Sequence, residues 1–110
     1  MGNKVGIYTP LPWDSNSNWK NDMDTFIFNL NKNQKYKKSK FNYSIYCSSS
    51  YGPLAAGFGC GSSTNSMNTI GHYNDINNYY VNGSEILPSN NQNKTYDLLE
   101  TEVYKIIFYK

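Results

Sequence analysis

The sequence has no arginine, a single histidine and two cysteines, and these shortages restrict the chemistry that it can carry. His72 could pair with Cys47 or Cys60 as base and nucleophile, but the spacings match no family pattern of that kind. The two cysteines also form no CxxC pair, the spacing that a structural zinc site commonly uses. We therefore expect neither a catalytic dyad nor a metal site.

Two further patterns approach a chemical signature without completing it. The segment GFGCG at residues 57–61 suggests a nucleotide-binding loop, but the later glycine of GxGxxG and a following Lys-Ser/Thr are missing. Two acidic pairs, Asp22 with Asp24 and Glu100 with Glu102, could support acid–base chemistry, but they mark no cleft. The sequence predicts a protein that is not an enzyme, with no catalytic residue, no metal ligand and no cofactor.

Charged residues and long apolar runs are also scarce. The formal net charge of +2 is too small to indicate a nucleic-acid partner. No apolar run approaches the roughly 20 residues of a membrane span, and the first ten residues lack the apolar core of a signal peptide. We expect a cytoplasmic protein without a transmembrane segment. In that reducing setting Cys47 and Cys60 are expected to be buried small hydrophobes, with a redox-sensitive thiol as the alternative.

Aromatic and turn-forming residues are abundant, and they favour a mainly β fold. Aromatic residues make up 16% of the 110 residues, among many Asn, Ser and Gly. No helix of more than a turn or two is predicted. The pattern predicts strands at residues 4–8, 25–30, 44–47, 69–73, 79–81 and 101–109.

Two of these predicted strands carry a more specific signal. In the 25–30 segment, Phe26, Phe28 and Leu30 alternate with Thr25, Ile27 and Asn29, so that the two sets lie on opposite faces. The 79–81 segment is followed by Asn82-Gly83, a dipeptide that is typical of a tight β-hairpin turn.

Three segments between the strands carry distinctive residues. Residues 13–24 form a polar loop in which we expect Trp13 and Trp19 to act as anchors over the core edge, with ligand stacking as the alternative. The segment 32–40 holds five lysines and is predicted to be a solvated loop or edge strand, with contact to phosphates or an acidic partner as the alternative. Around Phe58, Gly57 and Gly59 permit a close backbone approach or a positive φ.

Three segments, taken in order, resemble the TLDc domain, whose members include the oxidation resistance proteins and regulators of the vacuolar proton-ATPase. VGIYT at residues 5–9, the tryptophan loop and FIFNL at 26–30 are similar to the family's glycine–tyrosine strand, tryptophan loop and F-x-F-x-L strand. SIYC at 44–47, Gly52-Pro53 and GFG at 57–59 resemble its GP-x-FG-x-G region. LETEVY at 99–104 resembles its closing strand.

The resemblance implies an antiparallel two-sheet β-sandwich with short flanking helices. Family domains carry additional chain before the glycine–tyrosine strand, so residues 1–110 would correspond to the C-terminal two-thirds of a TLDc-like domain. The resemblance also departs in places: Ile7 stands where the family often has a second glycine, and Cys60-Gly61-Ser62-Ser63 replaces an Asp-aliphatic strand.

The function implied by the resemblance is a non-catalytic intracellular module that binds proteins, protects against oxidative stress and, in several members, engages the vacuolar proton-ATPase. The positions to test as interaction or structural-motif residues are Trp13, Gly52, Gly57, Phe58, Gly59 and Glu102. A purely structural role is the alternative: the glycines permit the turn, and Glu102 accepts hydrogen bonds that hold the last strand.

Two other functional hypotheses remain open at this stage. The first is a redox-responsive protein that acts through Cys47 or Cys60. The second is a truncated domain without independent function, because strands that lose their partners leave backbone groups and apolar faces exposed.

Overall fold

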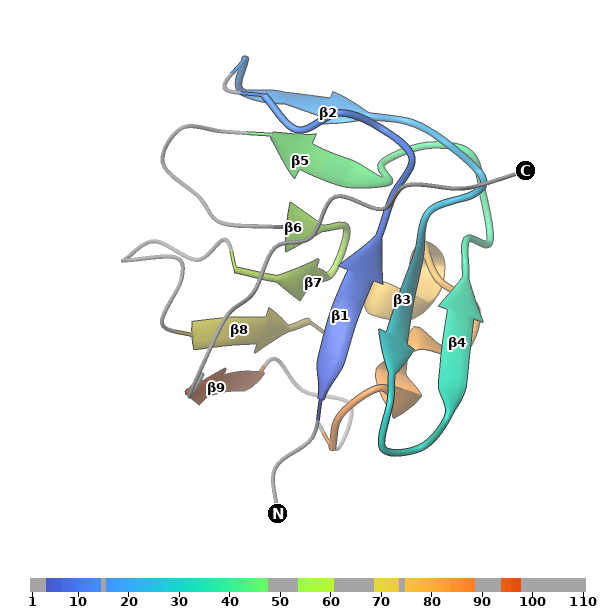
Figure 1. Ribbon diagram of the computed structural model, residues 1–110, viewed down its shortest axis with the longest axis vertical. Helices are drawn as coiled ribbons and strands as arrows, with labels where there is room; N and C mark the ends of the chain where they lie inside the picture. Colours follow the sequence, from blue (N-terminus) through green and yellow to red (C-terminus); the bar gives the residue numbers. More distant parts are fainter. Residues whose placement is uncertain are drawn as a thin grey trace, which may run out of the picture.

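The structure is a computed structural model, and it describes residues 4–14, 16–47, 54–60, 69–73, 75–88 and 94–97. The described residues form short strands and two 3-10 helices, arranged as two antiparallel sheets. Figure 1 shows that the strands of one sheet run across those of the other. The predicted mainly β, two-sheet antiparallel architecture is therefore confirmed. Within the described residues, no helix is long and apolar enough to cross a membrane.

The smaller sheet has three strands in the order β1-β3-β4. Its members are β1 (Val5–Tyr8), β3 (Phe26–Asn29) and β4 (Gln34–Lys37). β1 and β3 confirm the strands predicted at 4–8 and 25–30, and β4 lies within the lysine segment 32–40. β3 and β4 form a hairpin around residues 30–33, where Asn33 adopts a φ of 54°. Asn tolerates this left-handed conformation better than most residues, which explains the Asn-rich turn.

The larger sheet has six strands in the order β2-β5-β6-β7-β8-β9. The strands are β2 (Asn18–Lys20), β5 (Ile45–Cys47), β6 (Leu54–Ala55), β7 (Phe58–Gly59), β8 (Thr69–His72) and β9 (Lys94–Asp97). The predicted strands at 44–47 and 69–73 are confirmed as β5 and β8. β2 lies inside the segment that was predicted to be a loop.

The flanking helices are two 3-10 turns, η1 (Ile76–Asn78) and η2 (Gly83–Glu85), which lie behind β3 and β4 in Figure 1. They close one core that both sheets share. Its fully buried members come from every layer: Ile27, Ala55, Phe58, Ile76, Tyr80 and Ile86.

β3 places its more polar face in the core. Thr25, Ile27 and Asn29 are all 0% exposed, whereas Leu30 is 62% exposed. The buried amide of Asn29 is satisfied, because its Nδ2 donates to the Ile86 carbonyl at 2.8 Å and its Oδ1 accepts from the Lys32 N–H at 3.1 Å. Burying these polar groups is therefore compatible with a stable strand.

The opposite face of β3 carries half-buried aromatic rings. Phe26 stacks on Tyr8 of β1, with ring centroids 5.0 Å apart. Phe28 covers Gly6, where an added Cβ would lie 2.4 Å from the ring. Phe26 and Phe28 therefore lose contact with water by packing on residues of their own sheet, although they face away from the core.

The prediction of a strand at 79–81 is wrong. Tyr80 makes only an isolated bridge to Lys38, and Asn82-Gly83 leads into η2. A type I′ hairpin needs a positive φ at both central residues, and only Asn82 has one, at 57°. The other predicted strand near the end of the chain, at 101–109, lies outside the described residues.

The lysine segment is confirmed as an edge strand with one exception. β4 is the last strand of its sheet, and Lys35 and Lys37 are exposed on it. Lys38, at the end of β4, is only 5% exposed.

Candidate interaction site

The loop that connects β1 to β2, residues 9–17, carries Trp13 and is the first candidate site; we call it the tryptophan loop. It begins at Thr9, whose hydroxyl accepts a hydrogen bond from the Leu11 N–H at 3.1 Å. The same hydroxyl hydrogen-bonds to that of Thr25 at 2.9 Å, which ties the start of the loop to β3. The loop therefore leaves the core with a fixed direction.

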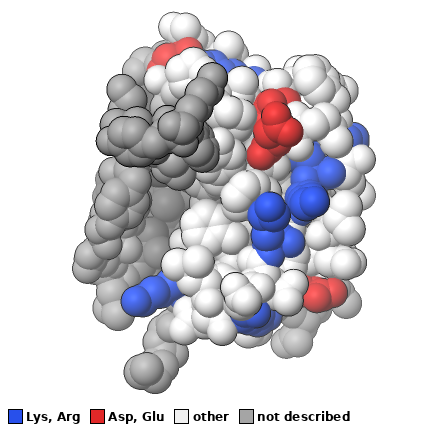
Figure 2. Space-filling view, turned by 45° about the vertical axis from the view of Figure 1, so that its right-hand side comes forward, with Lys and Arg blue, Asp and Glu red and all other residues white. Residues whose placement is uncertain are grey.

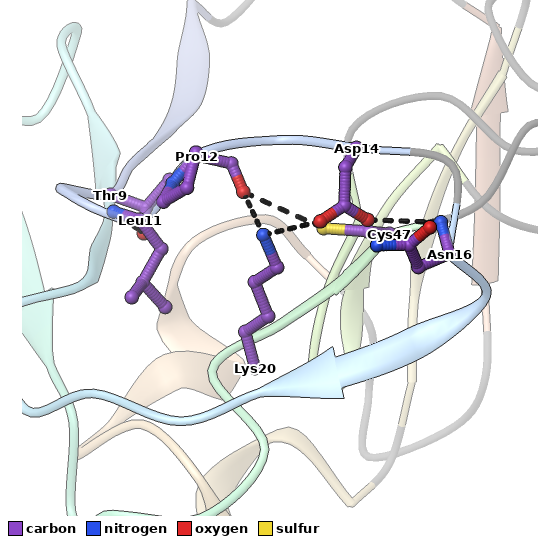
Figure 3. Close-up of polar contacts among 7 residues, drawn as sticks. All are labelled: Thr9, Leu11, Pro12, Asp14, Asn16, Lys20 and Cys47. Atoms are coloured by element: carbon purple, nitrogen blue, oxygen red, sulfur yellow. Dashed lines mark hydrogen bonds and ion pairs between the residues drawn. The ribbon is translucent and has the colours of Figure 1, made fainter.

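The ammonium of Lys20 on β2 holds the middle of the tryptophan loop (Figure 3). It lies 2.7 Å from Oδ2 of Asp14 and also donates to the carbonyl of Pro12. The other oxygen of Asp14 accepts from the Asn16 N–H at 2.9 Å. These hydrogen bonds, first that of Lys20 and then that of Asn16, hold the pKa of Asp14 below its ordinary value.

This network fixes the backbone on both sides of Trp13 while the indole stays 40% exposed. Trp19 on β2 is 41% exposed. We expected the indoles to anchor the loop over the core edge, but around Trp13 the anchoring comes from Lys20 and its polar contacts. A rigid backbone that presents a partly exposed indole is suited to contact with another molecule.

The glycine segment has a clear structural role. β6 and β7 form a tight hairpin in which Gly57 adopts a φ of 84°. A Cβ at Gly57 would lie 2.7 Å from Cα of Ile76, so the hairpin packs against η1 at backbone distance. Phe58 is 0% exposed and belongs to the core, and Gly59 has a φ of 138°.

These positions therefore stand apart from the tryptophan loop. Phe58 cannot touch a partner without a change in the core, whereas Trp13 can. Gly52 and Glu102, the other two candidate positions, lie outside the described residues. The role of all six as interaction residues stays a prediction.

The cysteines are buried and free, as predicted. Cys47 is 1% exposed and Cys60 is 5% exposed. The thiol of Cys47 donates weakly to the Pro12 carbonyl at 3.9 Å, next to the Lys20 contact (Figure 3). Burial raises the pKa of Cys60, which lowers the fraction of reactive thiolate. Among the described residues, no three His, Cys, Asp or Glu side chains gather as metal ligands would.

The sequence did not reveal the network around Lys20. Asp14 and Lys20 are separated by a turn and lie on different elements, so no helical or strand periodicity links them. The positive φ of Tyr43, 61°, was also unexpected, because bulky aromatic residues rarely adopt it. The only available signal was the pair of tryptophans in a short polar segment.

Among known protein families, the family model described as the TLDc domain matches residues 1–107. No curated protein and no solved structure matches the chain significantly.

Proposed function

The chain belongs to the TLDc domain family, and on this premise we propose that it is a non-catalytic protein-interaction module. We propose that it acts in the cytoplasm and contributes to protection against oxidative stress. Its first candidate partners are subunits of the vacuolar proton-ATPase. In the same proposal, residues 1–110 are the C-terminal two-thirds of a TLDc-like domain, and Gly52 and Glu102 are further positions to test.

The observation that carries the proposal is the presentation of Trp13. Tryptophan is enriched among residues that dominate binding energy at protein interfaces. A loop that is already fixed by Lys20, Asp14 and Thr9 loses little conformational entropy when a partner binds. The indole is exposed enough to be covered and firmly enough positioned to be recognised.

The proposal is tested by retention of purified vacuolar proton-ATPase subunits on the immobilised full chain. We expect the folded wild-type chain to retain at least one subunit, and Trp13→Ala to reduce retention by about tenfold. Leu30→Ala is the matched control, because Leu30 is 62% exposed on a different turn. Failure of the folded wild-type chain to retain any subunit would contradict the proposed partner, and equal retention by Trp13→Ala would exclude the Trp13 surface.

The burial of both thiols favours this function over a cysteine-based one. A Cys47→Ala/Cys60→Ala double variant should protect cells against peroxide as well as the wild type does. Loss of protection at equal protein abundance would favour the redox hypothesis instead.

A further inference from the structure

A second candidate surface consists of four aromatic rings, each in contact with the next: Tyr46, Trp19, Tyr43 and Tyr79, which we call the aromatic row. Trp19 meets Tyr46 edge to face at 5.1 Å and Tyr43 at 5.5 Å between centroids. Tyr43 meets Tyr79 at 6.0 Å in the same manner. The row brings together β2, β5 with the residues before it, and the end of η1.

The two inner residues of the row, Trp19 and Tyr43, are held in place by backbone contacts. Trp19 and Tyr46 are register partners in the β2–β5 pair, so their rings stand on the same face of the sheet. Tyr43 is held by its own backbone: its N–H donates to Oδ1 of Asn21 at 2.7 Å.

A buried cation fixes the peptides around Tyr43. The ammonium of Lys38 donates to the carbonyls of Asn42, at 2.8 Å, and of Tyr43, at 3.1 Å. Tyr43 has a φ of 61°, a conformation that is unfavourable for an aromatic residue and persists only where the surroundings determine it. Strained residues of this kind gather at functional sites, and the side chain of Tyr43 is partly exposed.

The aromatic row is exposed as well as rigid. Trp19 is 41% exposed and Tyr43 is 44% exposed. The two segments that carry them also contribute Met23, at 49%, and Phe41, at 57%, and the Asp22 N–H joins these segments by donating to the Phe41 carbonyl. Trp19 and Tyr43 are therefore exposed in contact with each other rather than singly, as expected of an interaction surface.

Positive charge borders the row at its Tyr79 end. The ammonium of Lys40 lies 4.7 Å from the ring centroid of Tyr79. Residues 18–43 contain six of the ten lysines and two of the eight acidic residues of the chain. In the described part of the chain the one ion pair is Lys20 with Asp14, so the lysines at 35, 37 and 40 have no carboxylate partner there.

Figure 2, which brings the β4 side forward, shows lysine side chains gathered in one band, with a group of acidic side chains at its upper end. The electrostatic potential on this face therefore changes from positive over the lysine band to negative at the acidic group. A ligand with negative charge is attracted toward the lysine band and repelled from the acidic group.

We propose that the aromatic row is the docking surface for an acidic peptide segment of a partner protein. Apolar side chains of the segment pack on Trp19 and Tyr43, and its carboxylates face Lys40 at the Tyr79 end of the row. The inference rests on the proposed function as an interaction module and adds to it a second surface and the chemistry of the partner. Rings fixed by strand register and by Lys38 suit a defined peptide, because little side-chain freedom is lost on binding.

The test is a selection of random twelve-residue peptides on the immobilised full chain, followed by fluorescence anisotropy with the enriched peptides. We expect enriched peptides to combine net negative charge with aliphatic or aromatic residues. Their binding should weaken when the salt concentration is raised from about 0.1 M to about 1 M, which shortens the screening length from about 10 Å to about 3 Å.

Three variants assign the binding to the row. Tyr43→Gly, Trp19→Ser and Lys40→Glu should each reduce the affinity of the enriched peptides by about tenfold or more. Tyr43→Gly is the most informative, because glycine relieves the positive φ and the variant should remain folded in near-ultraviolet circular dichroism. Leu30→Ser, which alters an exposed apolar residue on the turn between β3 and β4, should leave the affinity unchanged.

Several outcomes of these binding experiments would contradict the inference. The inference is overturned if no peptide is enriched, if the enriched peptides are neutral or basic, or if Tyr43→Gly binds them as tightly as the wild type. It is also overturned if phosphatidylcholine vesicles containing phosphatidylserine bind through Trp19 while the peptides do not. Retention of proton-ATPase subunits that depends on Trp13 but not on Tyr43 would leave the proposed function standing and remove this inference alone.

Discussion

At the scale of single residues, Gly57 is the position where the fold tolerates no side chain. Its φ of 84° is unfavourable for other residues, and an added Cβ would lie 2.7 Å from Cα of Ile76. Both the strain and the collision act in Gly57→Ala, so we expect a loss of about 2–4 kcal/mol in the free energy of unfolding. Chemical denaturation of the variant and the wild type measures it.

Gly57→Asn separates the two causes. Asparagine accepts a positive φ more readily than alanine but introduces the same Cβ. If the collision with Ile76 dominates, Gly57→Asn should lose nearly as much stability as Gly57→Ala. Stability close to that of the wild type in either variant would contradict the packing of this hairpin against η1.

The buried Lys38 should give the free energy of unfolding an unusual pH dependence. Burial, with a smaller contribution from Lys40 and against the attraction of Asp22, lowers the pKa of Lys38 from 10.5 to about 8. Between these two values the unfolded chain holds a proton that the folded chain has released, so stability rises with pH in this window. Below pH 8 both states are charged and the contribution is constant.

Lys38→Met removes the titrating group and serves as the comparison. The free energy of unfolding of the wild type relative to the variant should increase from pH 8 toward 10.5, by at most about 1 kcal/mol per pH unit after solvent screening. Because tyrosine ionisation affects both proteins, it cancels in the difference. Parallel pH curves for the two proteins would show that Lys38 does not titrate in this range.

At the scale of elements, the side chain of Tyr80 joins the segment after η1 to Ser44, the residue before β5. The hydroxyl of Tyr80, which is 0% exposed, donates to the Ser44 carbonyl at 2.8 Å. We expect Tyr80→Phe to lower the free energy of unfolding by about 1 kcal/mol, because the ring stays packed and only the hydrogen bond is lost.

Tyr79→Phe is the matched control for Tyr80→Phe, since the neighbouring Tyr79 hydroxyl makes no direct hydrogen bond to the described residues and its ring is partly exposed. Thermal unfolding of both variants measures the difference. Equal destabilisation by the two changes would mean that the Tyr80–Ser44 bond does not stabilise the fold.

The strands that the sequence predicts correctly are those with a local signal. β1, β3, β5 and β8 combine β-branched or aromatic residues with turn residues at their ends, and this pattern does not depend on distant contacts. β3 also shows the limit of the signal. Its alternation identifies two faces, but hydrophobicity alone favours the wrong one for the core, because Asn29 and Thr25 find hydrogen-bond partners in distant segments, at Ile86 and Thr9.

The elements that were missed depend on partners far away in the sequence. β2 is a three-residue strand that exists because Trp19 pairs with Tyr46. The Asn82-Gly83 dipeptide signals a hairpin locally, but the adjoining residues pack into the core as a 3-10 turn. Lys38 reads as one more exposed lysine, and nothing in its neighbours indicates that the carbonyls of Asn42 and Tyr43 fold back over it.

At the scale of the whole molecule, the two candidate surfaces differ in how they are built. The tryptophan loop is a single segment of the sequence, so Trp13, with Trp19 close by on β2, gave a usable signal for it. The aromatic row draws on residues from 19 to 79, and only the closure of the shared core brings them together. A function that depends on the row therefore depends on the complete core.

This dependence makes the unfolding transition of the full chain the last prediction. Ile27 of one sheet, Phe58 of the other and Ile76 of η1 lie in a single buried cluster, so the layers should unfold together. We expect coincident near- and far-ultraviolet circular dichroism melts of residues 1–110, and a calorimetric enthalpy of about 0.7 kcal/mol per residue near 60 °C. A flat near-ultraviolet signal with retained far-ultraviolet signal would indicate a molten chain. In that case the isolated chain does not close its core, and partner binding must be sought in a longer product.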